Sequence, residues 1–314
     1  MQDGEEREPI IQKRCAVVGI VGRTNAGKST LLNQLVGEKV SIVSPVAQTT
    51  RNTIRGILTE ERGQLVFLDT PGLHKAEGTL GTLLNRMARQ SAAGVDVLVV
   101  LFDGSRHPRL EDEGWMRRVL FAEQSVLFVL NKADLGNARE PLFREMWDRI
   151  RQEKGIQREV EWLSVSALKK TSVQPLLDRL FELAMPMEEL LFPEDVVTDY
   201  PRKLAISDTI REKFLMHLKD EVPHELGILV DKIEETVPGC WNVLVTVYVN
   251  RPSQKGIVIG NKGRVLKAVT QAAQRELTDI FGVKVSVDLW VKIERNWMKN
   301  FWLLRQMGYA GANA

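Results

Sequence analysis

The sequence predicts two domains: a doubly wound α/β domain with a mostly parallel sheet, followed by a smaller α+β domain. Three observations predict this. The chain has 314 residues, which exceeds the roughly 100 to 200 residues of a typical domain. Apolar strand-like runs alternate with amphipathic helical runs up to residue 184, and the rhythm changes after a segment with prolines at 186, 193 and 201.

In the first domain, short runs rich in Val, Leu and Phe are typical of strands buried on both faces of a parallel sheet. These runs predict strands at 17–21, 65–68, 97–102, 126–130 and 160–164. Amphipathic runs predict helices at 29–36, 83–93, 111–122, 141–153 and 175–184. The alternation of the two kinds of run predicts the doubly wound layer.

The second domain is predicted to begin with a helix at 204–218 and two strands at 228–233 and 243–249. A short strand-like run at 257–259, a glycine turn, a helix at 264–280 and a strand at 283–290 follow. We therefore expect an acidic extension at 1–12, the first domain at 13–186, a linker at 187–201 and the second domain, with a C-terminal helix, at 202–314.

Composition excludes several classes of protein. Hydrophobic residues at 44% and charged residues at 27% are globular values. The longest uncharged apolar run, at 97–102, is too short to span a bilayer, and the N-terminus lacks a signal-peptide pattern. Two cysteines cannot form a disulfide framework, so we expect a cytoplasmic protein.

Charge divides unequally between the two domains. Residues 1–199 hold 26 Lys and Arg against 29 Asp and Glu, a net of −3, whereas residues 200–314 hold 17 against 12, a net of +5. Within the second part, residues 236–275 contain no Asp or Glu. Such a block is often only a solvated face, but it also attracts a phosphate backbone.

Residues 22–29 read Gly-Arg-Thr-Asn-Ala-Gly-Lys-Ser and match the phosphate-binding pattern G-x-x-x-x-G-K-[ST]. The match follows a predicted strand and opens a predicted helix, which is the context that the pattern requires. Lys28 is expected to reach the β- and γ-phosphates, and the Ser29 hydroxyl to bind Mg²⁺. The expected nucleotide-binding residues here are Gly22, Arg23, Thr24, Asn25, Ala26, Gly27, Lys28 and Ser29.

Residues 131–134 read Asn-Lys-Ala-Asp and directly follow a predicted strand. A carboxylate accepts hydrogen bonds from two adjacent N–H donors, and guanine presents such a pair at N1 and N2 where adenine does not. Asp134 therefore predicts guanine, Asn131 is expected to join this segment to the phosphate loop, and the Lys132 stem to cover the purine. The predicted base-binding residues are Asn131, Lys132, Ala133, Asp134, Ser166 and Ala167.

A D-x-x-G run follows the strand at 65–68, at the sheet edge where ligands bind. Its carboxylate can hold Mg²⁺ through water, and its glycine N–H can meet a γ-phosphate. The expected contacts in this run are Asp69, Thr70, Pro71, Gly72 and Leu73. A second hydroxyl for Mg²⁺ is expected from Thr50, in preference to Thr49, so the predicted metal ligands are Ser29, Thr50 and Asp69.

The chain thus carries five elements in order: the phosphate loop at 22–29, the segment with Thr50, the D-x-x-G run at 69–72, the Asn-Lys-Ala-Asp run at 131–134 and the Ser166–Ala167 pair. This set is similar to that of translation-factor-related GTPases, and the chain resembles the Era group. Residues 22–33, 48–51 and 69–74 carry the resemblance in the first domain, and 258–263 and 289–292 carry it in the second. It extends over nearly the whole chain from Cys15. Thr24 stands where the family usually has Pro, and Ala26 where Val is common, but neither change removes a functional atom.

The resemblance implies a P-loop GTPase domain followed by a type II KH domain that binds RNA. It also implies binding to small-subunit rRNA near its 3′ end and to the 30S precursor, as a monomer. It leaves open peripheral contact with the cytoplasmic face of the membrane. The Gly-Asn-Lys-Gly run at 260–263 opens a predicted helix within the acid-free block, as a loop that clamps a nucleic-acid backbone would. The expected RNA contacts are Lys255, Gly260, Asn261, Lys262, Gly263, Arg264 and Lys267.

Catalysis is expected to depend on Asn25, Lys28, Thr50 and Gly72. Leu73 stands where Ras-like enzymes carry the glutamine that orients water, so slow intrinsic turnover is expected. The resemblance extends to GTPases in which an Asn at the position of Asn25 binds a monovalent cation. We therefore expect GTP or GDP, Mg²⁺ and K⁺ as cofactors, with Arg51 as the alternative source of positive charge.

Two other functions fit the sequence less well. An enzyme of metabolism or tRNA modification would need a second catalytic constellation, for which the chain has no spare length. An RNA scaffold with a vestigial nucleotide site conflicts with the intact Lys28, Ser29, Asp69 and Asp134. Three tryptophans in the second domain could stack on bases, but their spacing favours packing in the core. These are Trp290, Trp297 and Trp302.

Overall fold

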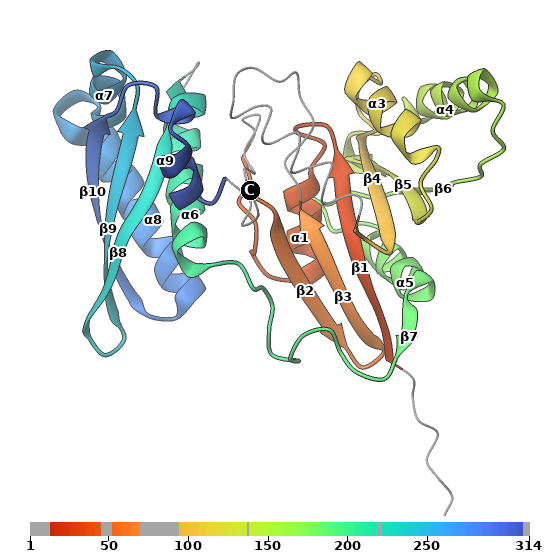
Figure 1. The fold of residues 1–314 in the computed structure, drawn as a ribbon, viewed down its shortest axis with the longest axis horizontal. Helices are drawn as coiled ribbons and strands as arrows, with labels where there is room; N and C mark the ends of the chain where they lie inside the picture. Colours follow the sequence, from red (N-terminus) through yellow and green to blue (C-terminus); the bar gives the residue numbers. More distant parts are fainter. Residues whose placement is uncertain (1–12, 45–51, 70–93, 137, 219–221, 310–314) are drawn as a thin grey trace, which may run out of the picture.

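A computed structural model describes residues 13–44, 52–69, 94–136, 138–218 and 222–309. The described chain forms two sheets, each with its own helices, which lie side by side and are joined by a segment that runs along the bottom of the first sheet (Figure 1). The expected helix at 83–93 lies outside the described residues. Within the described ranges, no helix combines the length and the apolar character needed to cross a membrane.

The first sheet has the strand order β2-β3-β1-β4-β5-β6, with β7 paired to β1. Its strands are β1 (Lys13–Gly22), β2 (Ile54–Glu60), β3 (Gly63–Asp69), β4 (Val97–Asp103), β5 (Ser125–Asn131), β6 (Glu161–Ser164) and β7 (Met185–Met187). β2 runs antiparallel to β3, and β7 runs antiparallel to β1. The other pairs are parallel. The sheet is therefore mostly parallel, as predicted.

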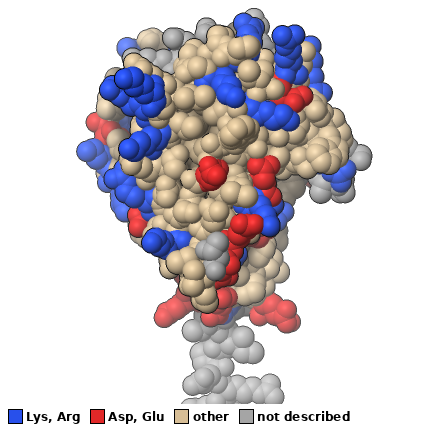
Figure 2. Space-filling model, turned by 90° about the vertical axis from the view of Figure 1, so that its left-hand side faces the viewer, with Lys and Arg blue, Asp and Glu red and all other residues tan. Residues whose placement is uncertain are grey.

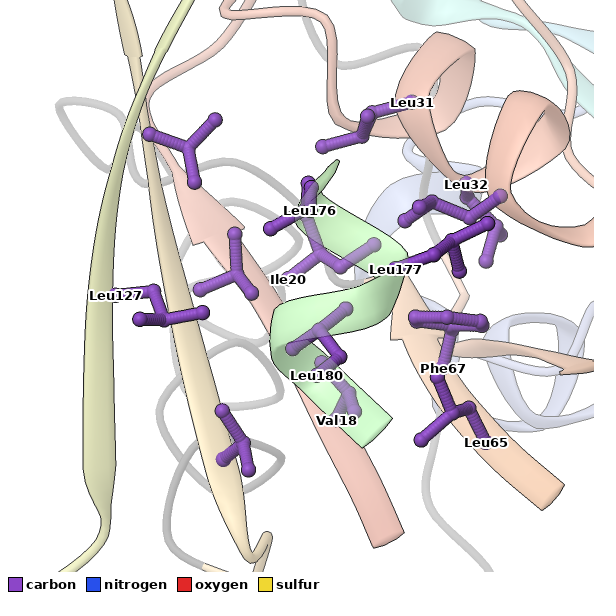
Figure 3. Close-up of a cluster of buried hydrophobic side chains, with 14 of the residues drawn as sticks. Val18, Ile20, Leu31, Leu32, Leu65, Phe67, Leu127, Leu176, Leu177 and Leu180 are labelled. Carbon is purple, nitrogen blue, oxygen red and sulfur yellow. The ribbon is translucent and has the colours of Figure 1, made fainter. Parts of the chain in front are cut away.

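Helices cover both faces of this sheet, which gives the predicted doubly wound layer (Figure 1). They are α1 (Lys28–Val36), α3 (Leu110–Val119), α4 (Glu140–Lys154) and α5 (Val173–Leu183). One core lies between the sheet and helices α1 and α5 (Figure 3). The second lies between the sheet and helices α3 and α4. Successive residues of β1 alternate between these two cores because strand side chains point alternately to the two faces.

The second domain follows the order α6 (Arg202–His217), β8 (Gly227–Val237), β9 (Cys240–Val249), α7 (Pro252–Ile259), α8 (Arg264–Phe281), β10 (Lys284–Ile293) and α9 (Phe301–Gln306). Its sheet has the order β10-β9-β8, with β10 parallel to β9. Helices α6 and α8 cover one face of the sheet (Figure 1). On β10, Val285, Val287, Leu289 and Val291 are buried while the residues between them are exposed.

The prediction of a strand-like run at 257–259 is wrong, because these residues end helix α7. Pro252 stands at the start of that helix, and the Gln254 side chain accepts the backbone N–H groups of Asn250 at 2.9 Å and Arg251 at 3.0 Å. These are helix-starting features. A run of three apolar residues has too few positions to distinguish a period of 2 from a period of 3.6. The order is therefore α-β-β-α-α-β.

The prediction that three tryptophans pack in the core is correct for one of them. Trp297 is 0% exposed, and its Nε1 donates to the carbonyl of Glu225 at 2.9 Å. Trp290 is 71% exposed and Trp302 is 67% exposed. Trp290 lies between the buried Leu289 and Val291 on β10, so strand alternation directs it to the face opposite α6 and α8.

Candidate functional site

The loop between β1 and α1 has a backbone that two glycines make possible. Gly22 and Gly27 have φ values of +152° and +97°. A Cβ on Gly22 would lie 2.3 Å from the carbonyl oxygen of Leu101, and a Cβ on Gly27 would lie 2.3 Å from Nδ2 of Asn131. A side chain at Gly22 would clash with β4, and one at Gly27 would clash with Asn131. Glycine is therefore required at both positions, whether or not a phosphate approaches the backbone.

Lys28 begins helix α1 and lies inside this loop. It is 6% exposed, and its Nζ donates to the carbonyls of Gly22 at 3.2 Å and Arg23 at 3.0 Å. Burial lowers the pKa of Lys28 to about 8, with Asp69 opposing the shift and Arg23 adding to it. The ammonium group is therefore held at the centre of the loop, where a bound phosphate would compensate for its burial.

Two hydroxyl groups and one carboxylate meet at the carboxyl end of β3. Ser29 Oγ donates to Asp69 Oδ2 at 2.6 Å, and Ser41 Oγ donates to the same oxygen at 2.9 Å. Asp69 is fully buried. Mg²⁺ prefers oxygen ligands and is commonly held by one or two carboxylates together with waters and phosphates. The donor set therefore fits Mg²⁺. The sequence patterns did not single out Ser41, because only the fold brings the segment after α1 to β3.

Asn131 connects the phosphate loop to two neighbouring segments. Its Nδ2 donates to the carbonyl of Ala26 at 2.9 Å, and its Oδ1 accepts the N–H of Ala167 at 3.0 Å. Ser166 Oγ donates to Asp134 Oδ1. The structure thus brings together the 22–29 loop, the 131–134 segment and the Ser166–Ala167 pair at one edge of the sheet, with the Asp134 carboxylate beside them.

A group of charged side chains, most of them buried, lies behind this edge, and no sequence pattern pointed to it. Lys132 Nζ donates to Asp103 Oδ2 at 2.7 Å, and Arg23 lies 3.5 Å from Asp103 Oδ2 and 3.3 Å from Asp112 Oδ2. Although burial opposes it, hydrogen bonding from Lys132 and Ser105 lowers the pKa of Asp103 below its usual range. Asp103 therefore holds the Lys132 side chain at the sheet edge. No pattern marks these carboxylates, because their partners lie far away in sequence.

Several expected site residues lie outside the described residues. These are Thr49, Thr50, Arg51, Thr70, Pro71, Gly72 and Leu73. Asn25 is described, is exposed and has a φ of 62°. The expected roles of all eight residues remain predictions.

The Gly-Asn-Lys-Gly loop in the second domain connects α7 to α8. Gly260, Lys262 and Gly263 have φ values of 75°, 51° and 76°. A Cβ on Gly260 would lie 2.5 Å from Cγ2 of Val265, so glycine is required there by packing as well as by conformation. Of the expected RNA contacts, Asn261, Lys262, Arg264 and Lys267 are exposed and Lys255 is half-buried. The loop and the first turn of α8 thus present Lys262, Arg264 and Lys267 to solvent.

Two family models match the chain. The model described as "50S ribosome-binding GTPase" matches residues 17–132, and the model described as "KH domain" matches residues 221–298. These ranges contain the phosphate loop and the Gly-Asn-Lys-Gly loop, respectively.

Relatives match nearly the whole chain. GTPase Era of Ruminiclostridium cellulolyticum is 35% identical over 293 residues, which cover 93% of this chain and 96% of the relative. GTPase Era of Staphylococcus haemolyticus is 35% identical over 300 residues, which cover 96% and 98%. A crystal structure of a substituted Aquifex aeolicus Era bound to GDP·AlF₄⁻ is 33% identical, with a TM-score of 0.85, and covers 95% of this chain and 99% of that one.

A second crystal structure holds Era in complex with MgGDPNP and nucleotides 1506–1542 of 16S ribosomal RNA. It is 33% identical to this chain, has a TM-score of 0.86, and covers 95% of this chain and 99% of that one. Similarity of this extent in both sequence and structure, together with the assembled nucleotide loops, shows that the chain belongs to the Era family of GTPases.

Proposed function

We propose that this protein is a GTP-dependent switch that binds small-subunit rRNA near its 3′ end and acts in assembly of the 30S subunit. Its membership of the Era family makes it a GTPase that uses guanine nucleotide and Mg²⁺. The observation that carries the proposal is a direct connection between the nucleotide site and the KH domain. We expect the protein to act as a monomer in the cytoplasm, with peripheral membrane contact left open.

The connection runs through the segment after α1. Ser41 donates to Asp69, a proposed Mg²⁺ ligand, and two residues later the Val43 N–H donates to Glu212 Oε1 at 3.0 Å. Glu212 belongs to helix α6 of the KH domain and is 1% exposed. Its other oxygen accepts a hydrogen bond from Lys39 Nζ at 2.7 Å. A rearrangement of oxygens around Mg²⁺ would therefore be transmitted to α6 over a few residues.

The proposed roles of the nucleotide-site residues follow from their positions. Lys28 would neutralise charge on the β- and γ-phosphates, and Asp134 would accept guanine N1–H and N2–H. Ser29 and Asp69 would hold Mg²⁺, with Thr50 as the third protein ligand. The backbone N–H of Gly72 would meet the γ-phosphate. The Gly-Asn-Lys-Gly loop at 260–263 would clamp the RNA backbone.

The test measures RNA affinity in two nucleotide states. The probe is a 37-nucleotide RNA equivalent to nucleotides 1506–1542 of 16S rRNA, and the protein is loaded with GDPNP and Mg²⁺ or with GDP. We expect tighter binding in the GDPNP state, and GTP turnover that changes when the RNA is added. Equal RNA affinity in both states, with unchanged turnover, would refute the switch.

A variant tests whether the connection through α6 carries the signal. Replacing Glu212 with Gln removes its charge and weakens its hydrogen bonds to Lys39 and Val43, so the affinity ratio between the two states should fall. Glu145→Gln, at an exposed position on α4, is the matched control and should leave the ratio unchanged. A ratio that is insensitive to Glu212→Gln would place the coupling elsewhere.

A further inference from the structure

The KH sheet has one face packed against helices α6 and α8 and an opposite face that is largely free of helices among the described residues. Trp290 lies on this opposite face of β10 at 71% exposure, and Trp302 lies on α9, which packs over one end of the same face, at 67% exposure. Large aromatic rings exposed on one face of a folded domain point to a surface that a partner covers.

Cations lie over the aromatic rings of this face. Lys255 Nζ, from α7, lies 5.9 Å from the centre of the Trp290 ring, and Lys292 Nζ lies 5.6 Å from the centre of the Tyr248 ring. Lys292 is two residues after Trp290 on the same strand and pairs in register with Tyr248. The exposed residues Trp290, Lys292 and Trp302, with the half-buried Lys255 and the buried Tyr248 beneath Lys292, therefore make up one surface, which we call the tryptophan face.

A hollow of about 490 Å³ lies at the α9 end of the tryptophan face. Tyr248, Lys292 and Trp302 line it, together with the carboxylates of Asp231 and Glu294. The hollow offers one exposed aromatic ring, that of Trp302, together with the cation of Lys292 and two hydrogen-bond acceptors, because Tyr248 is only 7% exposed. Nucleobases present a π-face for stacking and amino groups that donate hydrogen bonds.

We propose that the tryptophan face stacks the bases of single-stranded RNA that continues beyond the nucleotides held by the Gly-Asn-Lys-Gly loop. This deepens the proposed function and rests on it. A KH loop clamps about four nucleotides, so a longer strand needs further contacts. Lys255 joins the two surfaces, because it lies on the helix that leads into the loop and also reaches Trp290.

The distribution of charge favours RNA over an apolar partner. Figure 2 shows the KH-domain end of the molecule, the left-hand side of Figure 1: Lys and Arg predominate in its upper part, and Asp and Glu predominate at its lower end. The basic part suits phosphates. The carboxylates of Asp231 and Glu294 would repel phosphates but accept hydrogen bonds from bases, so they would orient a strand with its bases toward the hollow.

The experiment compares two RNAs of different length. The long probe is the 37-nucleotide RNA described above, and the short probe is the shortest RNA from a nested set of its truncations that the wild type still binds. Alanine substitution of a stacking aromatic costs between about fivefold and about a hundredfold in affinity. Trp290→Ala and Trp302→Ala should each lower the affinity for the long RNA by a factor within that range. Their affinity for the short RNA should stay within about twofold of the wild-type value.

Three variants serve as controls. Trp290→Phe keeps an aromatic surface and should retain most of the affinity for the long RNA. Phe121→Ala removes an equally exposed aromatic ring, 65% exposed, from the GTPase domain and should change nothing. Lys262→Asp, in the clamping loop, should lower the affinity for both RNAs. Because Trp290 and Trp302 are mostly exposed, their substitutions should leave the fold intact, which circular dichroism would check.

The outcomes separate the inference from the proposed function. Wild-type affinity of the tryptophan variants for both RNAs would overturn the inference, and would mean that a protein or a lipid surface covers this face, while the proposed function would stand. Failure of the wild type to bind any RNA would overturn both. Loss of affinity for the long RNA alone, with retention in Trp290→Phe, is the result expected for a stacking surface.

Discussion

The pKa of Asp112, behind the nucleotide loop, is set by two opposing effects, and an experiment can measure which of them is larger. Its side chain is fully buried, which disfavours the ionised form, and it lies 3.3 Å from the Arg23 guanidinium, which favours it. It also accepts the N–H of Arg109 at 2.9 Å, at the start of α3. Burial prevails and raises the pKa of Asp112 to about 6. The perturbation we consider is Asp112→Asn, which removes the titration and keeps an acceptor for Arg109.

The magnitude follows from the difference between the folded and unfolded pKa values. An unfolded aspartate titrates near 3.9, so between about pH 4 and pH 6 the folded protein binds more protons than the unfolded chain. Stability therefore falls as pH rises through this window, by about 3 kcal/mol over the whole titration. Asparagine has no such dependence. The stability of Asp112→Asn relative to wild type should therefore increase with pH, by about 1.5 kcal/mol between pH 5 and pH 7.5.

The assay is urea unfolding of both proteins at pH values from 5 to 7.5, and the quantity compared is the difference in free energy of unfolding. Taking this difference cancels the titration of other carboxylates that the substitution does not affect. Asp148→Asn is the control, because its carboxylate is exposed and pairs with Arg151 at 2.7 Å. That substitution should change stability by less than about 1 kcal/mol at either pH. A difference for Asp112→Asn that decreases with pH would show that the Arg23 ion pair outweighs burial.

Three further predictions concern the nucleotide. Asp134→Asn should weaken GTP binding and shift preference toward xanthosine triphosphate, because an amide donor would then face the guanine donors; unchanged GTP affinity by fluorescence titration would contradict the role of Asp134. Asn131→Ala should lose its hydrogen bonds to Ala26 and Ala167 and leave both backbone groups without that partner. The binding free energy of the nucleotide should become about 2 to 4 kcal/mol less favourable, which corresponds to at least about a thirtyfold loss of affinity. A loss below threefold would show that Asn131 does not hold the phosphate loop in its binding conformation. Potassium should accelerate GTP hydrolysis more than sodium at equal ionic strength, and Asn25→Ala should abolish the difference, since a cation beside Asn25 would act as an arginine finger does. A potassium effect that persists in Asn25→Ala, or none in the wild type, would direct attention to Arg51.

Most of the fold could be predicted because its strands are short, continuously apolar and bounded by turn residues. The strands at the centre of the first sheet are buried on both faces, so their composition alone distinguishes them from amphipathic helices. Helix α7 was missed because its apolar residues span only three positions. The prediction that Trp290 and Trp302 pack in the core was wrong because it relied on the spacing of the three tryptophans, whereas the alternation of β10 directs Trp290 outward.

The candidate site could be predicted only where residues are close in sequence. The phosphate loop and the 131–134 segment have fixed spacing, so pattern and position identify them together. The positions of Ser41, Asp103 and Asp112 have no such spacing, because each acts through a partner on another element. Their importance follows from burial and distance, which are properties of the fold.

The segment between Val43 and Asn52 contains Thr50, the proposed third protein ligand of Mg²⁺, and both of its ends contact the second domain or the linker. At one end, the Val43 N–H donates to Glu212 of α6. At the other, Asn52 Nδ2 donates to the Tyr200 hydroxyl at 2.9 Å, and that hydroxyl donates to Asp208 of α6 at 2.7 Å. A shift of Val43 or Asn52 on nucleotide binding would thus alter contacts that end on α6. By linkage, RNA binding that repositions α6 must change GTP affinity by the same factor by which GTP changes RNA affinity.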